Sequence, residues 1–257
     1  MKRQRVMALA KIQLFSLIRT PMNLALTFLL PVIIALVFGL AFAEIILPNE
    51  PTFGWTEGTN LFEELAPGLF AYSGLCIIFS VAQSYSKQKD QGILKRINTT
   101  PTTPSEFMAS SLLTYTSISI IQVAIIGVLF FSLGYRPDGA IAGMSLAFVF
   151  MVIFSLSAIG FGLITVTISK NYDVTGGIVQ LFVIPQQVIA SGLNPIPVAT
   201  QVVAMFMPVH YASDSITLLF NGTVLTDPRI WGNLMVLVIY CVLVMVAAIY
   251  LFKKREL

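Results

Sequence analysis

Charged side chains are scarce in this sequence. Asp, Glu, Lys and Arg make up only 11% of its 257 residues, whereas 56% of the residues are hydrophobic. A soluble domain normally carries about a quarter of its residues as charged side chains. The composition therefore excludes an ordinary soluble protein and predicts a protein that lies in a membrane.

The chain contains six long apolar stretches without a single Asp, Glu, Lys or Arg. Each stretch is long enough to cross a hydrocarbon layer of roughly 30 Å as a helix. Ion-coupled carriers usually place ionisable side chains near the middle of the membrane, where they bind the driving ion. The absence of such side chains argues against a transporter that powers itself. The predicted spans cover residues 21–43, 67–85, 107–133, 141–168, 174–191 and 230–252.

Cysteine and histidine are nearly absent. Cys76 and Cys241 fall inside different spans, so we expect buried apolar side chains rather than a disulfide. The single histidine, His210, lies one helical turn from Asp214, and this pair offers too few ligands for a metal site. No lysine follows a glycine-rich phosphate-binding loop. We therefore expect no catalytic residue, no metal and no cofactor bound by this chain, and any ATP must be hydrolysed elsewhere.

The basic residues predict an orientation. All but two of the 15 lie before the first span, after the last span, or in connections on one side of the membrane; the exceptions are Arg136 and Arg229. By the positive-inside rule, both termini and the long loop after the second span are cytoplasmic. A seventh crossing by residues 194–220 would place the basic C-terminal tail outside, and three prolines divide that stretch into short pieces. We predict that it forms a re-entrant helical hairpin on the outer side.

The first twenty residues have the pattern of a basic amphipathic helix. On a helical wheel Met7, Leu14 and Ile18 share the apolar half, while Lys11 and Arg19 lie on the other. Such a helix is expected to lie in the inner headgroup layer. The predicted fold is therefore an all-α integral membrane protein with one domain over residues 1–257. It consists of an interfacial helix (about 1–20), six transmembrane helices, and an extracellular hairpin before the last span.

The loop after the second span carries the most specific pattern. The run Asp90-Gln91-Gly92-Ile93-Leu94-Lys95-Arg96-Ile97, followed by Thr100-Pro101, resembles the cytosolic coupling segment of ABC-2 type permeases, the membrane subunits of ABC exporters. Ile93 stands where that family usually has threonine. The resemblance implies a docking site for a separate ATP-binding subunit, which would hold the ATP and Mg²⁺. The implied coupling residues are Asp90, Gly92, Leu94, Lys95, Arg96, Ile97, Thr100 and Pro101.

The residues of this loop allow two interpretations by themselves. Ile93, Leu94 and Ile97 share one narrow helical face with basic neighbours, which suits a helix that docks into a groove of a partner. A solvated loop whose charges only enforce topology is the alternative. The resemblance favours the docking helix, and it implies that the N-terminal helix also braces the ATPase.

A second segment resembles the same family. Met207-Pro208-Val209-His210-Tyr211-Ala212-Ser213-Asp214 is similar to the Asn-Pro-x-x-Tyr-Ala-x-acidic segment before the last span of these permeases, with Met207 and His210 departing from the common residues. The resemblance places Pro208, His210, Tyr211 and Asp214 in the outer hairpin. It also implies that the chain pairs with a second permease copy, as a homodimer or a heterodimer.

Polar residues recur along the fifth span. Gln180, Gln187, Ser191 and Asn194 follow one helical stripe. Amide and small side chains often serve as contacts between membrane helices, so packing explains the stripe without a substrate. The resemblance adds that this span lines the path between two protomers in ABC-2 permeases. Both interpretations stay open.

The function expected from the resemblance is that of a permease subunit in an ATP-driven exporter. Spans without charge suit an amphipathic drug, lipid or lipid-linked molecule, carried outward across the cytoplasmic membrane of a prokaryote. No nucleic-acid partner is expected, because topology already accounts for the basic residues. One alternative is a membrane enzyme that acts on lipid at the outer surface through His210, Tyr211 and Asp214. The other is an energy-independent scramblase or membrane scaffold.

Overall fold

Helices account for every regular element in the part of the chain that the structure, a computed structural model, describes: residues 3–19, 25–42, 45, 61–92, 104–169, 171–190 and 198–255. This result confirms the predicted all-α class for the described residues. The helices are α1 (Arg3–Ile18), the π-helical segment η1 (Ala25–Leu29), α3 (Leu30–Phe42), α4 (Leu61–Leu75), α5 (Ile77–Asp90), α7 (Pro104–Ser132), α8 (Ile141–Ile168), α9 (Tyr172–Ala190), α10 (Val198–Ala204), α11 (Pro208–Phe220) and α12 (Pro228–Arg255).

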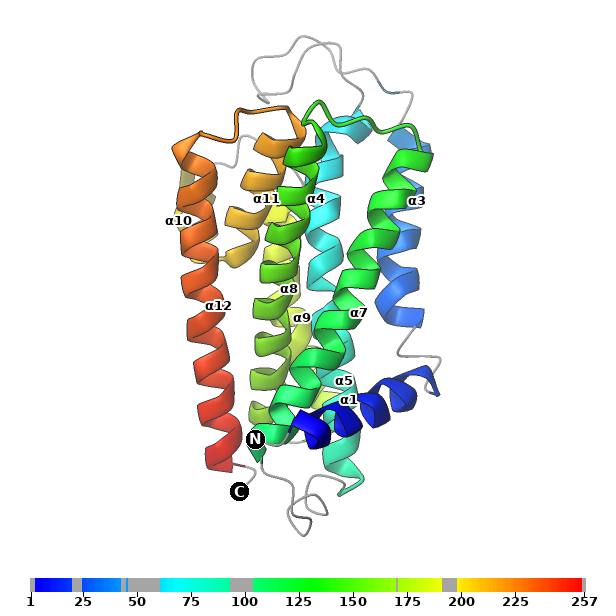
Figure 1. Cartoon of the computed structure of the whole chain (residues 1–257), viewed down its shortest axis with the longest axis vertical. Helices are drawn as coiled ribbons and strands as arrows, with labels where there is room; N and C mark the ends of the chain where they lie inside the picture. Colours follow the sequence, from blue (N-terminus) through cyan, green and yellow to red (C-terminus); the bar gives the residue numbers. More distant parts are fainter. Residues whose placement is uncertain are drawn as a thin grey trace.

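The long helices run side by side along the longest axis of the molecule, and α1 lies across one end of the bundle (Figure 1). That end also holds the last turns of α5 and α12 and the first turns of α7 and α9. The opposite end holds the connection between α7 and α8 and the start of α12. The two ends of the described chain thus lie at the same end of the bundle, the arrangement that the positive-inside argument predicts for an even number of crossings.

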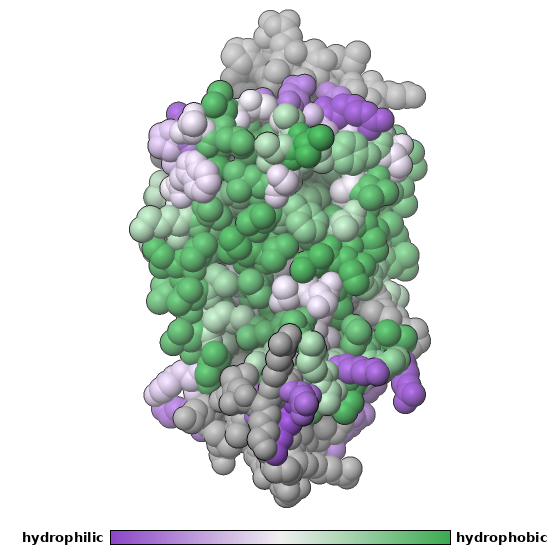
Figure 2. Space-filling model, in the orientation of Figure 1, coloured by the Kyte–Doolittle hydropathy of each residue, from purple (hydrophilic) through white to green (hydrophobic). Residues whose placement is uncertain are grey.

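Four helical stretches are long and apolar enough to cross a membrane: Leu61–Asp90, Ala109–Ser132, Ile141–Ile168 and Pro228–Leu251. Figure 2 shows a broad hydrophobic band across the middle of the visible face, with hydrophilic residues toward both ends. The chain is therefore an integral membrane protein. Two further predicted spans correspond to shorter helices, Thr27–Phe42 and the 19-residue α9. The six-span topology stays a prediction.

The second predicted span, 67–85, is longer than expected and is interrupted. The α4–α5 pair begins six residues earlier, at Leu61, continues to Asp90, and breaks at Cys76. It is the most buried of the four long stretches. The side chain of Gln122, on α7, donates a hydrogen bond of 2.5 Å to the Ser73 carbonyl near the break. A side chain of the neighbouring helix α7 thus bonds to the backbone beside the break.

Close contacts between small residues hold the bundle around α8. A Cβ added to Gly162 would lie 2.9 Å from the Cβ of Val81, on α5. A Cβ on Gly160 would lie 2.7 Å from Cγ1 of Val244, on α12. Without a strong hydrophobic driving force between helices in lipid, such close backbone approach and its dispersion contacts stabilise the packing. The two glycines therefore let α8 sit directly against both neighbours.

The stretch predicted as a re-entrant hairpin contains the short helices α10 and α11, joined at residues 205–207. Their turn lies beside α12, because the Tyr240 hydroxyl donates a 2.7 Å hydrogen bond to the Phe206 carbonyl. Tyr240 lies about 18 Å along α12 from the first residue of that helix, at 1.5 Å per residue. From this depth α11 returns to the α7–α8 connection, where the Gly139 N–H donates to the Phe220 carbonyl. The placement of the hairpin in a bilayer stays a prediction, and its residues 194–197 lie outside the described part of the chain.

Candidate functional site

The predicted coupling segment begins where α5 ends. Gly92 adopts a left-handed backbone conformation (φ 68°), and its N–H donates a 3.0 Å hydrogen bond to the Lys89 carbonyl. Glycine enters this conformation without the steric penalty of a Cβ, and it commonly terminates helices in this way. Gly92 therefore closes the C-terminal end of α5. The other predicted coupling residues, Leu94, Lys95, Arg96, Ile97, Thr100 and Pro101, lie outside the described residues.

Asp90 connects the end of α5 to the start of α9. Its Oδ2 accepts a 3.0 Å hydrogen bond from the backbone N–H of Tyr172, the first residue of α9. A carboxylate at a helix N-terminus satisfies an N–H that has no partner inside the helix, and it interacts favourably with the positive end of the helix dipole. The acidic residue of the motif thus holds the start of a second helix, α9, in place.

Lys89 makes the complementary contact with α8. Its Nζ donates to the carbonyls of Val166 and Ser169, at 3.4 and 3.3 Å. Both carbonyls belong to the C-terminal turn of α8, where a cation is favourable because the dipole is negative. Adjacent residues of opposite charge therefore bind the end of α8 and the start of α9.

A buried chain of hydroxyl groups continues this contact between the helices. Ser86 of α5 and Thr175 of α9 lie 2.8 Å apart at their oxygens, and the Thr175 hydroxyl lies within 2.7 Å of the Ser169 hydroxyl. Thr175 also bonds to the Asn171 carbonyl at 2.9 Å. Together with Lys89 and Asp90, these groups form a cluster at residues 86–90, 169 and 171–175, which we name the α5 anchor. Sequence reasoning missed it; the only signal was the polar residues clustered at 169–175.

Helix α1 docks on the base of α7 through polar contacts. The Gln13 amide donates to the Ser111 hydroxyl (3.0 Å), and the Thr114 hydroxyl donates to the Ala10 carbonyl (3.3 Å). Arg5 lies 4.0 Å from the buried Glu106 carboxylate. The side of α1 that faces the bundle therefore includes a glutamine.

Much of the apolar half predicted for α1 is instead exposed. Met7, Leu14 and Ile18 from that half, and Ile12 and Phe15 from outside it, are all open to the surroundings. Apolar side chains around a basic helix at the end of the bundle suit the boundary between lipid and water. The interfacial placement of α1 stays a prediction, and the contact of Gln13 with α7 adds a polar side that the helical wheel did not identify.

The described residues of the predicted polar stripe on α9, Gln180 and Gln187, lie at the surface, and one of them borders a cavity. Gln180 and Gln187 are exposed, and Ser191 and Asn194 lie outside the described residues. Gln187 also borders a cavity of about 110 Å³ between α9, α3 and α4. The neighbouring Gln186, which the stripe did not include, is buried and lines a larger cavity of about 420 Å³ on another side of α9.

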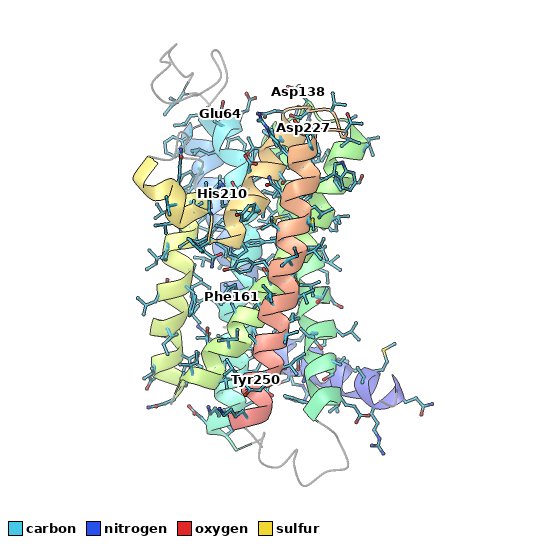
Figure 3. All side chains as sticks on the ribbon, turned by 90° about the vertical axis from the view of Figure 1, so that its left-hand side faces the viewer. Glu64, Asp138, Phe161, His210, Asp227 and Tyr250 are labelled. Carbon is cyan, nitrogen blue, oxygen red and sulfur yellow. The ribbon has the colours of Figure 1, made fainter. Side chains whose placement is uncertain are left out.

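The hairpin residues that resemble the family motif serve packing contacts. Pro208 is buried at the first position of α11, and the rings of His210 and Tyr211 meet edge to face with centroids 5.2 Å apart. Figure 3 shows His210 between the upper end and the middle of the molecule. The Asp214 carboxylate accepts a 2.7 Å hydrogen bond from the Asn233 amide of α12. Tyr211 donates to the Met205 carbonyl at 2.8 Å.

The end of the bundle opposite α1 carries a polar cavity of about 340 Å³ with acidic walls. Glu63, Glu64 and Asp138 line it beside the buried ring of Tyr135. Figure 3 labels Glu64 and Asp138 at this end. Burial, and then the negative charge of these carboxylates, raise the pKa of the Tyr135 hydroxyl above its usual range. Tyr135 is therefore neutral at physiological pH. The acidic character agrees with the side that the charge pattern assigns to the exterior.

No group of three or more His, Cys, Asp or Glu side chains among the described residues is placed to hold a metal. The α5 anchor and the contacts between α1 and α7 consist of hydrogen bonds to helix ends and carbonyls, so they connect helices to one another.

The chain was compared with protein-family models and with curated proteins. No curated protein matches it. The model of the ABC-2 type transporter family matches residues 4–221, which includes α1, the coupling segment and the hairpin. The match covers most of the 257 residues. The chain therefore belongs to the ABC-2 type transporter family, as a membrane permease domain of an ABC transporter.

Proposed function

We propose that this chain is the permease subunit of an ATP-driven exporter. A separate subunit would bind ATP and Mg²⁺ and dock on α1 and on the loop after Gly92. Two permease copies, identical or different, would form the transport unit in the cytoplasmic membrane of a prokaryote, with the α1 end facing the cytoplasm. The observation that carries the proposal is the α5 anchor, because it joins the predicted docking loop directly to two other helices.

The anchor gives the loop a route into the membrane. A push on residues 93–103 acts on the end of α5, where Lys89 holds the end of α8 and Asp90 holds the start of α9. The hydroxyl contacts between Ser86, Thr175 and Ser169 make the same three helix ends move together. Since α9 carries Gln180 and Gln187, motion of its lower end shifts the polar stripe along the proposed path.

Amphipathic molecules are the substrate class that the spans favour. The predicted spans contain no charged residue, and the cavities beside α9 are lined almost entirely by apolar side chains. A small hydrophilic ion would lose its hydration without gaining a charged partner. A drug-like molecule, a lipid or a lipid-linked compound would keep its apolar part in contact with the spans.

The test is recovery of the ATPase. The tagged chain is extracted in mild detergent, copurifying proteins are identified, and ATP hydrolysis is measured. The double substitution Leu94→Ala with Arg96→Glu should abolish recovery of a P-loop ATPase. The matched control is Leu225→Ala with Arg229→Glu, which makes the same changes at the opposite end of the bundle and should leave recovery unchanged.

Two results would contradict the proposal. If the chain purifies alone after gentle extraction and lipids still cross reconstituted vesicles, the energy-independent alternative replaces it. If the Leu94 and Arg96 double variant retains both the ATPase and export, the docking role of the loop is wrong.

A further inference from the structure

An apolar cavity lies between α9, the α10–α11 hairpin, α8 and α12. Its volume is about 420 Å³, within the usual range of small-molecule sites. Phe161, one of its walls, lies near mid-height of the molecule in Figure 3. Its walls include Phe161, Phe182, Pro185, Gln186, Phe206 and Tyr240. We name it the α9–hairpin cavity.

One polar atom in this cavity, the side-chain oxygen of Gln186, has no hydrogen-bond partner among the described residues. Gln186 is only 4% exposed. The amide nitrogen donates to the Phe182 carbonyl at 3.2 Å. Because a carbonyl can only accept, the nitrogen must be the atom that faces Phe182, and the unpartnered atom must be the oxygen. A buried acceptor without a partner is unfavourable, so a donor from a ligand would be stabilised there.

A second acceptor lies one turn away on the same helix. Pro185 has no N–H, so it cannot supply the usual helical hydrogen bond to the Leu181 carbonyl. Leu181 also lines the cavity. The Tyr240 hydroxyl, which could have supplied a donor, is already directed to the Phe206 carbonyl. The α9–hairpin cavity thus combines apolar walls with the unpartnered Gln186 oxygen, on a helix where Pro185 leaves the Leu181 carbonyl without its usual helical donor.

We infer that the α9–hairpin cavity binds a lipid-like molecule whose apolar body carries a hydroxyl or amide N–H. The donor bonds to the Gln186 oxygen, and the apolar body fills the space between Phe161, Phe182 and Phe206. Exposed apolar residues border the cavity: Leu181 (74%), Val202 (61%) and Phe206 (73%). A ligand therefore enters sideways from the hydrocarbon layer rather than from water.

This site is separate from the predicted polar path. Gln187, the path residue next in sequence, borders the smaller cavity against α3 and α4. Adjacent residues of a helix point about 100° apart, so Gln186 and Gln187 border different cavities. The inference depends on the membrane placement of the bundle and does not depend on an ATPase partner.

Photolabelling in lipid nanodiscs tests the inference. The probe is hexadecan-1-ol with a diazirine in the middle of its chain, and the comparison probe is its methyl ether, which has the same body but no donor. Labelled peptides are mapped by mass spectrometry. The alcohol should label peptides of α9 and the hairpin at least about threefold more than the ether, the ratio expected for one hydrogen bond. Gln186→Met should remove this difference, whereas Gln187→Met should keep it.

Three outcomes overturn the inference. Equal labelling by alcohol and ether in the unmodified chain means that no donor is recognised, and this comparison requires no variant to fold. Loss of the preference in Gln187→Met, with its retention in Gln186→Met, assigns recognition to the other cavity. Absence of both labels, with crosslinks from Phe206 to a second copy of the chain, means that a protomer fills the space. Preferential labelling in a preparation without ATPase leaves this site standing while the proposed function fails.

Discussion

Replacing Asp90 with alanine tests whether its hydrogen bond to the Tyr172 N–H holds the start of α9 in place. The substitution removes the acceptor for the Tyr172 N–H, and with it a negative charge at the start of α9. Loss of a capping side chain at a helix N-terminus costs about 1 kcal/mol. Because Asp90 is exposed to solvent, we take this central value and not the larger one of a buried charged pair.

Hydrogen exchange measures this effect at the helix that Asp90 touches. A loss of about 1 kcal/mol raises the opening equilibrium of the first turn of α9 roughly fivefold. Peptides that cover residues 171–176 should therefore exchange about five times faster in Asp90→Ala, while peptides from α12 remain unchanged. Export in reconstituted vesicles should fall while ATP hydrolysis continues, because the loop then moves without carrying α9.

The variant Asp90→Asn serves as the internal control. Asparagine keeps an oxygen that can accept from the Tyr172 N–H, but it loses the charge that interacts with the helix dipole, a term of about 0.3–1 kcal/mol. Because salt screens the interaction of the exposed Asp90 with the dipole, we take a value near the lower end, about 0.4 kcal/mol, and exchange should then rise only about twofold. Unchanged exchange at residues 171–176 in Asp90→Ala would show that the bond to Tyr172 does not hold α9, and the mechanical argument would then be wrong.

Three further substitutions test other contacts. Glu106→Gln removes the charge beside Arg5, and because Arg5 is 39% exposed we expect the contact between α1 and α7 to weaken by only about 0.5 kcal/mol, seen as faster exchange in α1. Gln122→Leu removes the hydrogen bond to the Ser73 carbonyl and should lower the free energy of unfolding by about 0.6–1.7 kcal/mol, measured by steric trapping in bicelles. The pKa of Tyr135 is raised in the folded state, so its neutral hydroxyl contributes to the free energy of unfolding below pH 10, and this contribution is lost as the pH rises above 10. Tyr135→Phe should therefore lessen the drop in thermal stability between pH 9 and about 11. An unaltered drop would contradict the assignment.

The sequence predicts the helices well where hydropathy alone sets their ends. The fourth apolar stretch, 141–168, coincides with α8, and prolines start α7 at Pro104, α11 at Pro208 and α12 at Pro228. Ends formed by polar turns were missed. Helix α5 continues from the predicted limit of residue 85 to Asp90 because its last turn bonds to α8 and α9 rather than to lipid. Hydropathy cannot register partners that come from distant segments.

The candidate site shows the same division. The acidic residue and the glycine of the motif have clear structural tasks at the end of α5, whereas the coupling role of the segment stays a prediction. The buried Gln13 was not predictable, because its partners Ser111 and Thr114 lie about a hundred residues away. Gln186 was missed for a related reason. The periodic stripe selects residues on one face of α9, whereas burial of Gln186 depends on Phe161, Phe206 and Tyr240 from three other elements.

Helix α9 is where the proposed coupling and the proposed ligand site meet. Its first residue is held by Asp90, and about fourteen residues later Gln186 and Gln187 border two different cavities. A helix whose backbone hydrogen bonds are intact moves as a rigid body, but Pro185 weakens α9 just below these two glutamines. A shift at the α5 anchor would therefore bend α9 at Pro185, and its upper part would change both cavities at once. Restoring the missing N–H with Pro185→Ala should stiffen α9 and reduce export without affecting ATPase recovery, whereas unchanged export would show that α9 does not need this bend.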